Sequence, residues 1–514
     1  MWRSRVIIAV TTVAVAVTAV VAGPASASRS AGPRVLTVGT YHGVRGQFAT
    51  IQAAVSAARS GDWVLVAPGD YHENSGSTDH PSGVLITTGI HLRGMDRNGV
   101  VVDGTTPGPG GPCSSDPARQ TKDRNGVLAY KASGVSIENL TACNFLTSST
   151  GGNQIWFNGG DGSGQIGMHG YYGAYLTAST TYSNDNNKPR GEYGIFVSNA
   201  DGPGLIEHTY ASSMGDSAYY IGACRDCNTV LRDAHAQYSA LGYSGTNSGG
   251  NLIIENSEFD LNKTGIVSNS QNNDDRPSPE IGSCVTGKGP LGTGSCTIWR
   301  HNYVHDNNNV NVPGAGSGLS GGAPVGTGIV LAGTTYVTLQ GNLVTGNGAW
   351  GVLVTDLPDQ ETPPPGANCQ GGTYIPPPAS VCYFPAFGNY LLDNEFAGNG
   401  FYRNPTNGDI GLIAAPHNPG NCFNGNIDRQ GLTTDPPFLQ AQPYYPCNQP
   451  NAGDMGPLFA EAVCASEIFL DCPNLPLATY PKFQKVELPP IPREATMPNP
   501  CVNVPRNPWC PNNP

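Results

Sequence analysis

Two things are scarce in this chain of 514 residues: positive charge and long apolar runs. Lysine and arginine number 26 against 38 aspartates and glutamates, so the formal net charge is −12. So acidic a chain is not expected to bind nucleic acid or an anionic membrane surface, because both repel negative charge. After residue 21 no apolar stretch approaches the length of a membrane span. The mature protein is therefore predicted to bind neither nucleic acid nor membrane.

The one long apolar run lies at the start of the chain and has the layout of an export signal. Arg3 and Arg5 form a positive n-region, residues 6–21 are apolar, and residues 25–27 form an Ala-x-Ala cleavage site. A retained membrane anchor is the alternative, but this run is short for one. We therefore predict a signal peptide over residues 1–27 and a secreted, extracellular protein.

The chain has fourteen cysteines, an even number, which fits export. Outside the cell they are expected to form disulfides rather than to bind metal. A redox or metal role for the Cys224-x-x-Cys227 motif is the alternative. No second motif of this kind and no histidine pair completes a zinc site. Proximity along the chain predicts the pairs Cys224–Cys227, Cys284–Cys296 and Cys369–Cys382.

The chain repeats itself about every 23 residues. Gly242 and Gly265 open similar short strands, and Gly328 and Gly351 do so again further on. The repeats carry β-branched and aromatic residues with short polar turns and no helical period, which is typical of strands. A period of this size predicts a solenoid, because one unit cannot bury its apolar residues alone. Three short strands per turn, here called a rung, predict an all-β fold, the parallel β-helix.

Both ends of a solenoid expose apolar edges and need caps. Residues 47–58 have apolar side chains at a helical period, which predicts a capping helix at the N-terminal end. From residue 427 the period fades, and prolines and cysteines accumulate. The sequence therefore predicts a β-helix domain with its cap over residues 28–426. Residues 427–514 are predicted to form a disulfide-stapled tail.

The second strand of each rung ends at a recurrent polar position. Stacked polar side chains at such a turn satisfy backbone groups, so we predict a polar ladder there. The predicted ladder residues are Asn139, His208, Asp233, Asn256, His301 and Asp393.

The N-terminal part of the solenoid carries a resemblance to a known group of proteins. Residues 48–73, FATIQAAVSAARSGDWVLVAPGDYHE, followed by the segments 89–94 and 100–104, resemble the start of right-handed parallel β-helix proteins of the pectate-lyase-like superfamily. The resemblance covers roughly residues 37–425 and implies a right-handed coil. It leaves the activity open, because the superfamily holds polysaccharide lyases, hydrolases, pectin methylesterases, uronan epimerases and non-enzymatic proteins.

The catalytic motifs of these enzyme families are missing. The chain has no paired-aspartate motif of the polygalacturonases, no Arg-Ile-Lys and no Gly-Arg-Pro-Trp of the pectin methylesterases. The Asp-Pro-His-Asp of the uronan epimerases is reduced to His305-Asp306. The leading interpretation is a secreted carbohydrate-active β-helix that binds a polysaccharide along its first sheet and cleaves or epimerises it. The alternative is a non-catalytic extracellular β-helix that binds a glycan or a protein.

Polar residues and long insertions gather in the turns after the Gly-led strands. Adjacent rungs lie about 4.8 Å apart, so residues distant in sequence can form one site. Asp201, Arg225 and Asp226 are the candidate catalytic residues, because an arginine beside carboxylates suits the binding of a uronic acid. Lys263 is the candidate base, as lysine is in one family of β-helix lyases. A solvated polar turn is the alternative for each.

Asp274 and Asp275 are the candidate metal ligands. They follow two asparagines in an oxygen-rich run of the kind that binds Ca²⁺, although the spacing of known calcium loops is missing. Calcium is therefore left open as a cofactor. His301 and His305 are four residues apart, which does not make them converge on a strand and turn. A polysaccharide is the expected partner, and the chain is expected to be a monomer.

Four aromatic residues are candidates for a sugar-stacking strip. The alternative is that they pack inside the coil or under loops, since the sequence does not fix which face of each strand they occupy. These residues are Phe196, Tyr220, Tyr172 and Tyr175.

Overall fold

The computed structural model describes residues 32–185, 187–271, 297–314, 322–359, 369, 372–441, 443–447, 449–466 and 479–513. The predicted signal peptide and the predicted metal ligands Asp274 and Asp275 lie outside the described residues. The chain divides by its internal contacts into Met1–Pro33 and Arg34–Pro514, and the second unit is the one described below.

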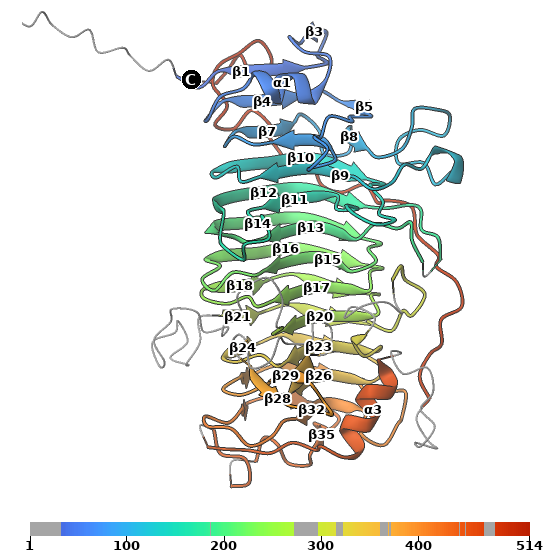
Figure 1. Cartoon of the computed structure of the whole chain (residues 1–514), viewed down its shortest axis with the longest axis vertical. Coiled ribbons are helices and arrows are strands. Elements are labelled where there is room, and N and C mark those ends of the chain that lie inside the picture. The colour runs from blue at the N-terminus through green and yellow to red at the C-terminus, as the bar shows by residue number, and fades with distance from the viewer. Residues whose placement is uncertain are drawn as a thin grey trace, which may run out of the picture. The chain divides into compact units, whose positions relative to one another are not determined.

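This unit is a parallel β-helix in which each rung gives one strand to a first sheet and two strands to a larger sheet (Figure 1). Strands of the first sheet pair in parallel, with Leu241 opposite Thr264 and Tyr243 opposite Ile266. The predicted right-handed parallel β-helix, with its period of about 23 residues, is therefore confirmed. The first sheet contains β6 (Ser82–Ile86), β9 (Asn125–Tyr130), β11 (Ile155–Asn158), β13 (Tyr193–Ser198), β15 (Ser217–Gly222), β17 (Leu241–Thr246), β20 (Thr264–Asn269), β23 (Thr327–Ala332), β26 (Trp350–Thr355), β32 (Gly408–Ile413) and β35 (Thr434–Asp435).

The larger sheet holds the second and third strands of the rungs, and all its pairings are parallel. In the middle rungs the second and third strands join into one long strand that bends at a corner. Its members are β1 (Val35–Val38), β4 (Trp63–Val66), β5 (Gly69–Tyr71), β7 (His91–Gly94), β8 (Val100–Asp103), β10 (Val135–Cys143), β12 (Met168–Ser179), β14 (Ala200–Ser212), β16 (Thr229–Gln237), β18 (Leu252–Glu255), β19 (Glu258–Asp260), β21 (Thr297–Arg300), β22 (Tyr303–His305), β24 (Val337–Gln340), β25 (Leu343–Thr345), β30 (Tyr390–Leu392), β31 (Glu395–Ala397), β33 (Cys422–Asn424) and β34 (Ile427–Asp428).

Columns of buried asparagines follow the turns in the C-terminal half of the coil. In the first column, Nδ2 of Asn342 donates to Oδ1 of Asn394, and Nδ2 of Asn302 donates to Oδ1 of Asn342. Each amide also donates to a backbone carbonyl of the preceding rung, so turn groups that water cannot reach are satisfied. The columns are Asn302–Asn342–Asn394–Asn426, Asn262–Asn307–Asn347–Asn399 and Asn389–Asn421.

In the C-terminal half the buried ladder lies one residue beyond its predicted position, whereas Asn139 is buried and donates to a backbone carbonyl as predicted. Asn256, His301 and Asp393 have φ of 50°, 54° and 54°, so they turn the chain at the corner. The ladder side chain is the next residue, as Asn302 and Asn394 illustrate. Asparagine, aspartate and histidine are the residues that best tolerate this left-handed backbone, which explains why the corner looked like a ladder in the sequence.

The glycines that begin the strands of the first sheet make room for these columns. A Cβ on Gly242 would lie 2.6 Å from the carbonyl oxygen of Gly265 and 2.8 Å from Nδ2 of Asn262. A Cβ on Gly265 would meet Asn307 in the same way. Such distances are far below contact distance, so only glycine fits. The glycines therefore repeat in the sequence because each strand passes close to an asparagine side chain.

The N-terminal cap is α1 (Ile51–Ala57), which is shorter than the predicted helix over 47–58. Thr50 caps it by accepting a hydrogen bond from the backbone N–H of Ala53, so the helix begins at Ile51. Gln52 then reaches β6, the edge strand of the first sheet. Its Oε1 accepts from the N–H of Leu85 at 2.7 Å, and its Nε2 donates to the carbonyl of Leu85 at 3.1 Å. The side-chain amide of Gln52 thus makes the two backbone hydrogen bonds that a further strand would make to Leu85.

The C-terminal part closes the other end and then returns along the coil. The helix α3 (Pro457–Ala465) packs on the last strands of the first sheet through Leu458. Residues 479–513, here called the strap, run back past many rungs (Figure 1). Near one end, Asn407 Nδ2 donates to Tyr480 Oη, and near the other, Trp509 Nε1 donates to the carbonyl of Val44. The strap therefore contacts both ends of the coil.

The remaining elements are short. They are the hairpin β2 (Thr40–Tyr41) and β3 (Val44–Arg45), the 3₁₀ helix η1 (Pro117–Arg119), and an antiparallel sheet of β27 (Leu357–Asp359), β28 (Thr373–Ile375) and β29 (Val381–Phe384). Among the described residues, no helix is long and apolar enough to span a membrane.

Disulfides join cysteines in both the coil and the strap. The predicted pairs Cys224–Cys227 and Cys369–Cys382 are confirmed, and Cys284–Cys296 lies outside the described residues. The other pairs among the described cysteines are Cys113–Cys143, Cys422–Cys447 and Cys501–Cys510.

Candidate functional site

An aromatic strip lies on the outer face of the first sheet. Trp156, Phe196 and Tyr220 occupy one register position on β11, β13 and β15. The rings of Trp156 and Phe196 stack with centroids 5.0 Å apart and 11° between their planes, and Tyr220 meets Phe196 edge-on at 4.9 Å. Tyr193 stacks on Phe196 as well, at 4.3 Å. These four residues are here called the aromatic strip.

The alternation of the strands explains why these rings face outward. Ile195 and Val197, on either side of Phe196, are buried in the core, so Phe196 must point away from it. Trp156, Tyr193 and Phe196 remain half-buried, and Tyr220 is 9% exposed. The strip therefore presents flat apolar ring surface that solvent still reaches.

Hydrogen bonds to the sheet hold the strip rigid. Trp156 Nε1 donates to Ser198 Oγ at 2.9 Å, and Tyr193 Oη donates to Asp216 Oδ2 at 3.0 Å. Burial, together with the charge of Asp216, raises the pKa of Tyr193 well above its usual value, so this hydroxyl stays a donor. The rings are fixed before any ligand arrives, which lowers the entropy cost of binding.

Only two of the four predicted aromatic candidates belong to this strip. Phe196 and Tyr220 do, whereas Tyr172 and Tyr175 lie on β12 in the larger sheet. Tyr172 donates to Glu207, and Tyr175 stacks on His208 at 4.9 Å. Sequence reasoning missed Trp156 and Tyr193. The register of β11 with β13, which pairs Trp156 with Phe196, is the signal that would have found the tryptophan.

Two exposed ion pairs flank the strip at the edge where the strands of the first sheet end. Asp201, at the start of β14, lies 2.6 Å from Nδ1 of His169 on β12. Lys131, which follows β9, lies 2.5 Å from Asp161. The hydrogen bond between Lys131 and Asp161 lowers the pKa of the carboxyl and raises that of the amine. Imidazole, amine and carboxylates thus line one side of the strip.

Arg225 and Asp226 lie at the same edge, in the loop closed by the Cys224–Cys227 disulfide after β15. The N–H of Gly202 donates to the carbonyl of Cys227, so this loop sits on the rung next to Asp201. The Arg225 side chain is exposed and that of Asp226 is half-buried. Three of the four predicted catalytic residues are therefore brought to one edge of the first sheet.

Lys263 is not brought to this group. It precedes β20, so it lies at the opposite edge of the first sheet from residues that follow the strands. The residue is fully buried; its N–H donates to Ser239 and its carbonyl accepts from Gly326. At the edge where Asp201 and Arg225 lie, His169 is a basic group that sequence reasoning overlooked, because it is 32 residues from Asp201.

Side chains that could bind a metal ion lie away from the aromatic strip. In the described part of the chain, two groups of three side chains could hold an ion: Asp70 with His72 and Asp103, and a second group on later rungs. In the first group Asp103 already accepts from two backbone N–H groups, and Nδ1 of His72 bonds to the carbonyl of Thr105. Burial and the charge of Asp103 raise the pKa of Asp70. This group is satisfied by the protein itself.

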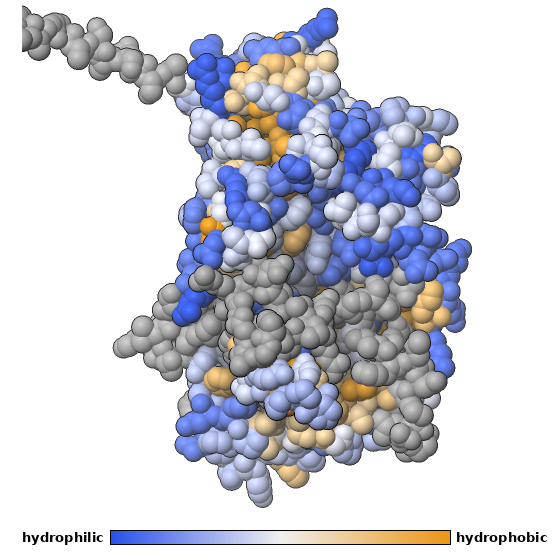
Figure 2. Space-filling view, viewed as in Figure 1, coloured by the Kyte–Doolittle hydropathy of each residue, from blue (hydrophilic) through white to orange (hydrophobic). Residues whose placement is uncertain are grey.

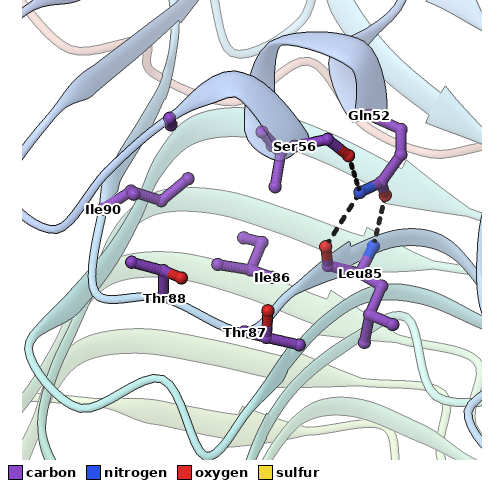
Figure 3. Close-up of a pocket in the computed structure, with 9 residues that line it drawn as sticks. Gln52, Ser56, Leu85, Ile86, Thr87, Thr88 and Ile90 are labelled. Atoms are coloured by element: carbon purple, nitrogen blue, oxygen red, sulfur yellow. Dashed lines mark hydrogen bonds between the residues drawn. The ribbon is translucent and has the colours of Figure 1, made fainter.

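A pocket of about 270 Å³ lies between α1 and β6 (Figure 3). Gln52 and Ser56 point into it from the helix, opposite Leu85 and Thr87 (Figure 3). Apolar residues gather over this end of the molecule (Figure 2). None of the residues that line the pocket has a carboxylate, imidazole or amine, so it offers no acid–base chemistry.

No family model and no curated protein matches this chain. Among solved structures it is similar to the A-module of a mannuronan C-5 epimerase from Azotobacter vinelandii, at 15% identity and a TM-score of 0.41, covering 74% of this chain and 87% of that one. It is also similar to a mannuronic-acid-specific polysaccharide family 6 lyase from human gut microbiota, at 14% identity and a TM-score of 0.38, covering 78% of this chain and 82% of that one. A third similar structure is a pectate lyase, at 10% identity and a TM-score of 0.35, covering 72% of this chain and 76% of that one. Such likenesses carry no reaction from one protein to another.

Proposed function

We propose that this protein is a secreted, carbohydrate-active β-helix that binds a polysaccharide along the aromatic strip. The observation that carries this proposal is the contact of three aromatic rings, those of Trp156, Phe196 and Tyr220, in one register position on consecutive rungs. Rungs repeat at about 4.8 Å, so the three rings form a track about 10 Å long. A sugar ring has an apolar C–H face that packs on such a track, while its hydroxyls need polar partners at the rim.

The rim supplies those partners. Along the edge of the first sheet, His169 and Asp201 offer donors and acceptors, and Lys131 and Arg225 offer positive charge. The chain as a whole is acidic, so these local cations are what would admit a polysaccharide that carries carboxylates. We assign Arg225 to the binding of such a carboxylate.

Alanine substitutions in the strip test this function. Phe196→Ala should weaken polysaccharide binding at least tenfold, or about 1.4 kcal/mol, since it removes the ring on which its neighbours stack. Arg225→Ala should weaken the binding of uronate-containing chains and leave neutral chains unaffected. Isothermal titration against a panel of neutral and acidic polysaccharides measures both.

Tyr303→Ala is the matched control, because Tyr303 is an exposed aromatic residue of the larger sheet and not of the strip. It should bind like the parent. Failure of the parent to bind any polysaccharide would favour the non-catalytic β-helix that binds a protein. Equal binding by parent and Phe196→Ala would move the glycan site away from the strip.

A catalytic function is favoured by the pair of His169 and Asp201. The carboxylate holds Nδ1, and the ring is 64% exposed, so Nε2 is accessible. An imidazole oriented in this way can take the α-proton of a uronic acid whose carboxylate Arg225 neutralises. The electron pair left on carbon then forms a double bond and expels the glycosidic oxygen at the β-carbon, and that oxygen takes a proton from water. In epimerisation the carbon instead takes a proton from water on the face opposite His169.

Ultraviolet detection of unsaturated products and NMR of the treated polysaccharide distinguish cleavage from epimerisation. His169→Gln should abolish turnover and keep binding within about twofold, the split expected of a base that does not hold the substrate. Unchanged turnover in His169→Gln would refute this role. If the parent binds the polysaccharide without turning it over, the protein is a carbohydrate-binding protein and not an enzyme for that polysaccharide.

A further inference from the structure

A second polar array lies on the outer face of the third strands, on β16, β19 and β22. Ala236, Phe259 and Val304, in the middle of these strands, are buried in the core, so the residues on either side of them face outward. Parallel pairing places these neighbours in two columns. The columns are His235–Glu258–Tyr303 and Gln237–Asp260–His305.

Imidazole and carboxylate groups meet across these rungs. Nε2 of His235 lies 2.8 Å from Oδ1 of Asp260, and Nε2 of His305 lies 3.0 Å from Oε1 of Glu258. The ligand atoms of His235, Glu258 and Asp260 all lie within 4.8 Å of one another. One nitrogen and two oxygen donors, from two consecutive rungs, therefore gather at one place, and His305 bonds to Glu258 from the next rung.

A second set of groups holds these side chains from behind. Nδ1 of His305 lies 2.9 Å from Oδ2 of Asp306, and Gln237 donates to the other oxygen of Asp260 at 2.8 Å. The Tyr303 ring stacks on His305 with centroids 3.8 Å apart. Gln237 thus orients Asp260, and His305, itself fixed by Asp306, orients Glu258. Ligands of metal sites are usually held by such outer hydrogen bonds.

We propose that His235, Glu258 and Asp260 bind one divalent transition-metal ion of the zinc class. One imidazole nitrogen and two carboxylate oxygens suit Zn²⁺, which takes three protein ligands and keeps its fourth tetrahedral position for water or another small ligand. Calcium and magnesium prefer shells made of oxygen alone, so neither fits this donor set. The ion would take the place of the proton that now links His235 to Asp260, and it would join β16 and β19 through side chains.

The surroundings favour a cation. The negative charges of Asp260, Glu258 and Glu494 all act on His235. Glu494 belongs to the strap, so a third carboxylate adds negative charge to the array. The side chain of Asp260 is only 7% exposed, which strengthens its interaction with an ion.

Equilibrium dialysis tests the site on the full mature chain, produced without a histidine tag and stripped with a chelator. The parent should bind one equivalent of Zn²⁺, measured by elemental analysis, and should bind no Ca²⁺ at this array. Replacing Zn²⁺ with Co²⁺ should give the visible absorption of a tetrahedral complex. His235→Gln and Asp260→Asn should each weaken zinc binding at least tenfold.

His208→Gln is the matched control, because His208 also lies near a carboxylate, 3.8 Å from Asp233, outside the array. It should bind zinc like the parent. The proposal is overturned if the parent binds less than one equivalent, if binding survives both array variants, or if Ca²⁺ binds as tightly as Zn²⁺. The number of zinc ions that the parent binds tests the proposal even where a variant fails to fold.

Discussion

The two halves of the coil are held together by different means. The C-terminal half uses columns of one residue type, in which Asn302, Asn342 and Asn394 repeat the same bonds rung after rung. The N-terminal half uses a buried ion pair, in which Arg93 lies 2.6 Å from Glu138 and also donates to the carbonyls of residues 500 and 502 in the strap. A column spreads its stabilisation over many rungs, whereas the ion pair concentrates it on one side chain.

The largest effect is expected in the N-terminal half, from Arg93→Met. Both partners are nearly inaccessible to water, so the change leaves the Glu138 carboxylate buried without its cation, at a cost of about 3–5 kcal/mol. Urea unfolding measures this loss. Arg232→Met is the control, because Arg232 pairs with Glu207 on the same face but is 42% exposed, and its loss should cost about 1 kcal/mol or less. Equal costs at the two sites would show that burial is not what separates them.

The next effect is expected in the C-terminal half, from Asn342→Leu. The change removes the donor to Trp299 and Asn394 and the acceptor for Asn302, and it leaves buried groups unsatisfied on two rungs. We expect a loss of about 3 kcal/mol in the same unfolding assay. Gln340→Leu, at a partly exposed position on the same rung, should stay within about 0.5 kcal/mol of the parent. A loss below 1 kcal/mol for Asn342→Leu would mean that the column is dispensable.

A smaller effect is expected at the N-terminal edge, from Gln52→Leu. This change removes both hydrogen bonds to Leu85, and solvent can partly replace them at a half-buried site, so we expect a loss of about 1 kcal/mol. The amide of Leu85 should exchange its hydrogen faster, as measured by NMR or mass spectrometry. Gln47→Leu, at an exposed position before the same helix, should leave that amide unchanged.

The smallest effect is expected at the C-terminal edge, where Asp435 ends the last strand of the first sheet. Burial, with the charges of Asp454 and Glu461, raises the pKa of Asp435 from 3.8 to about 6. A carboxyl with a raised folded-state pKa favours folding below its unfolded pKa, and this contribution is lost as pH rises through the folded value. The melting temperature should therefore fall slightly between about pH 4 and pH 6, and Asp435→Asn should remove that slope. The same slope in the variant would assign the effect to other groups.

The fold could be predicted from the sequence because the residues that repeat are those that the coil requires at fixed positions. Gly242 and Gly265 are 23 residues apart because each must admit an asparagine of the neighbouring turn. In the C-terminal half the ladder was predicted one residue early because corner and ladder positions are adjacent and accept similar residues, as Asn256 and Ser257 show.

The candidate site was predictable only in part. Asp201, Arg225 and Asp226 follow strands of one sheet, so their common edge could be inferred from strand order alone. Lys263 precedes its strand, and the sequence did not show that this places it at the opposite edge. The pairing of His235 with Asp260 depends on register between strands of different rungs, which local pattern does not reveal.

The strap has a consequence for how this molecule can change in length. An open solenoid can gain or lose a repeat without disturbing the rest. Here one added rung would move Asn407 about 4.8 Å further from Val44, and the strap between Tyr480 and Trp509 would need one or two more residues to reach both. Insertions in the coil must therefore be matched by insertions near the C-terminus, so the strap acts as a ruler that fixes the number of rungs.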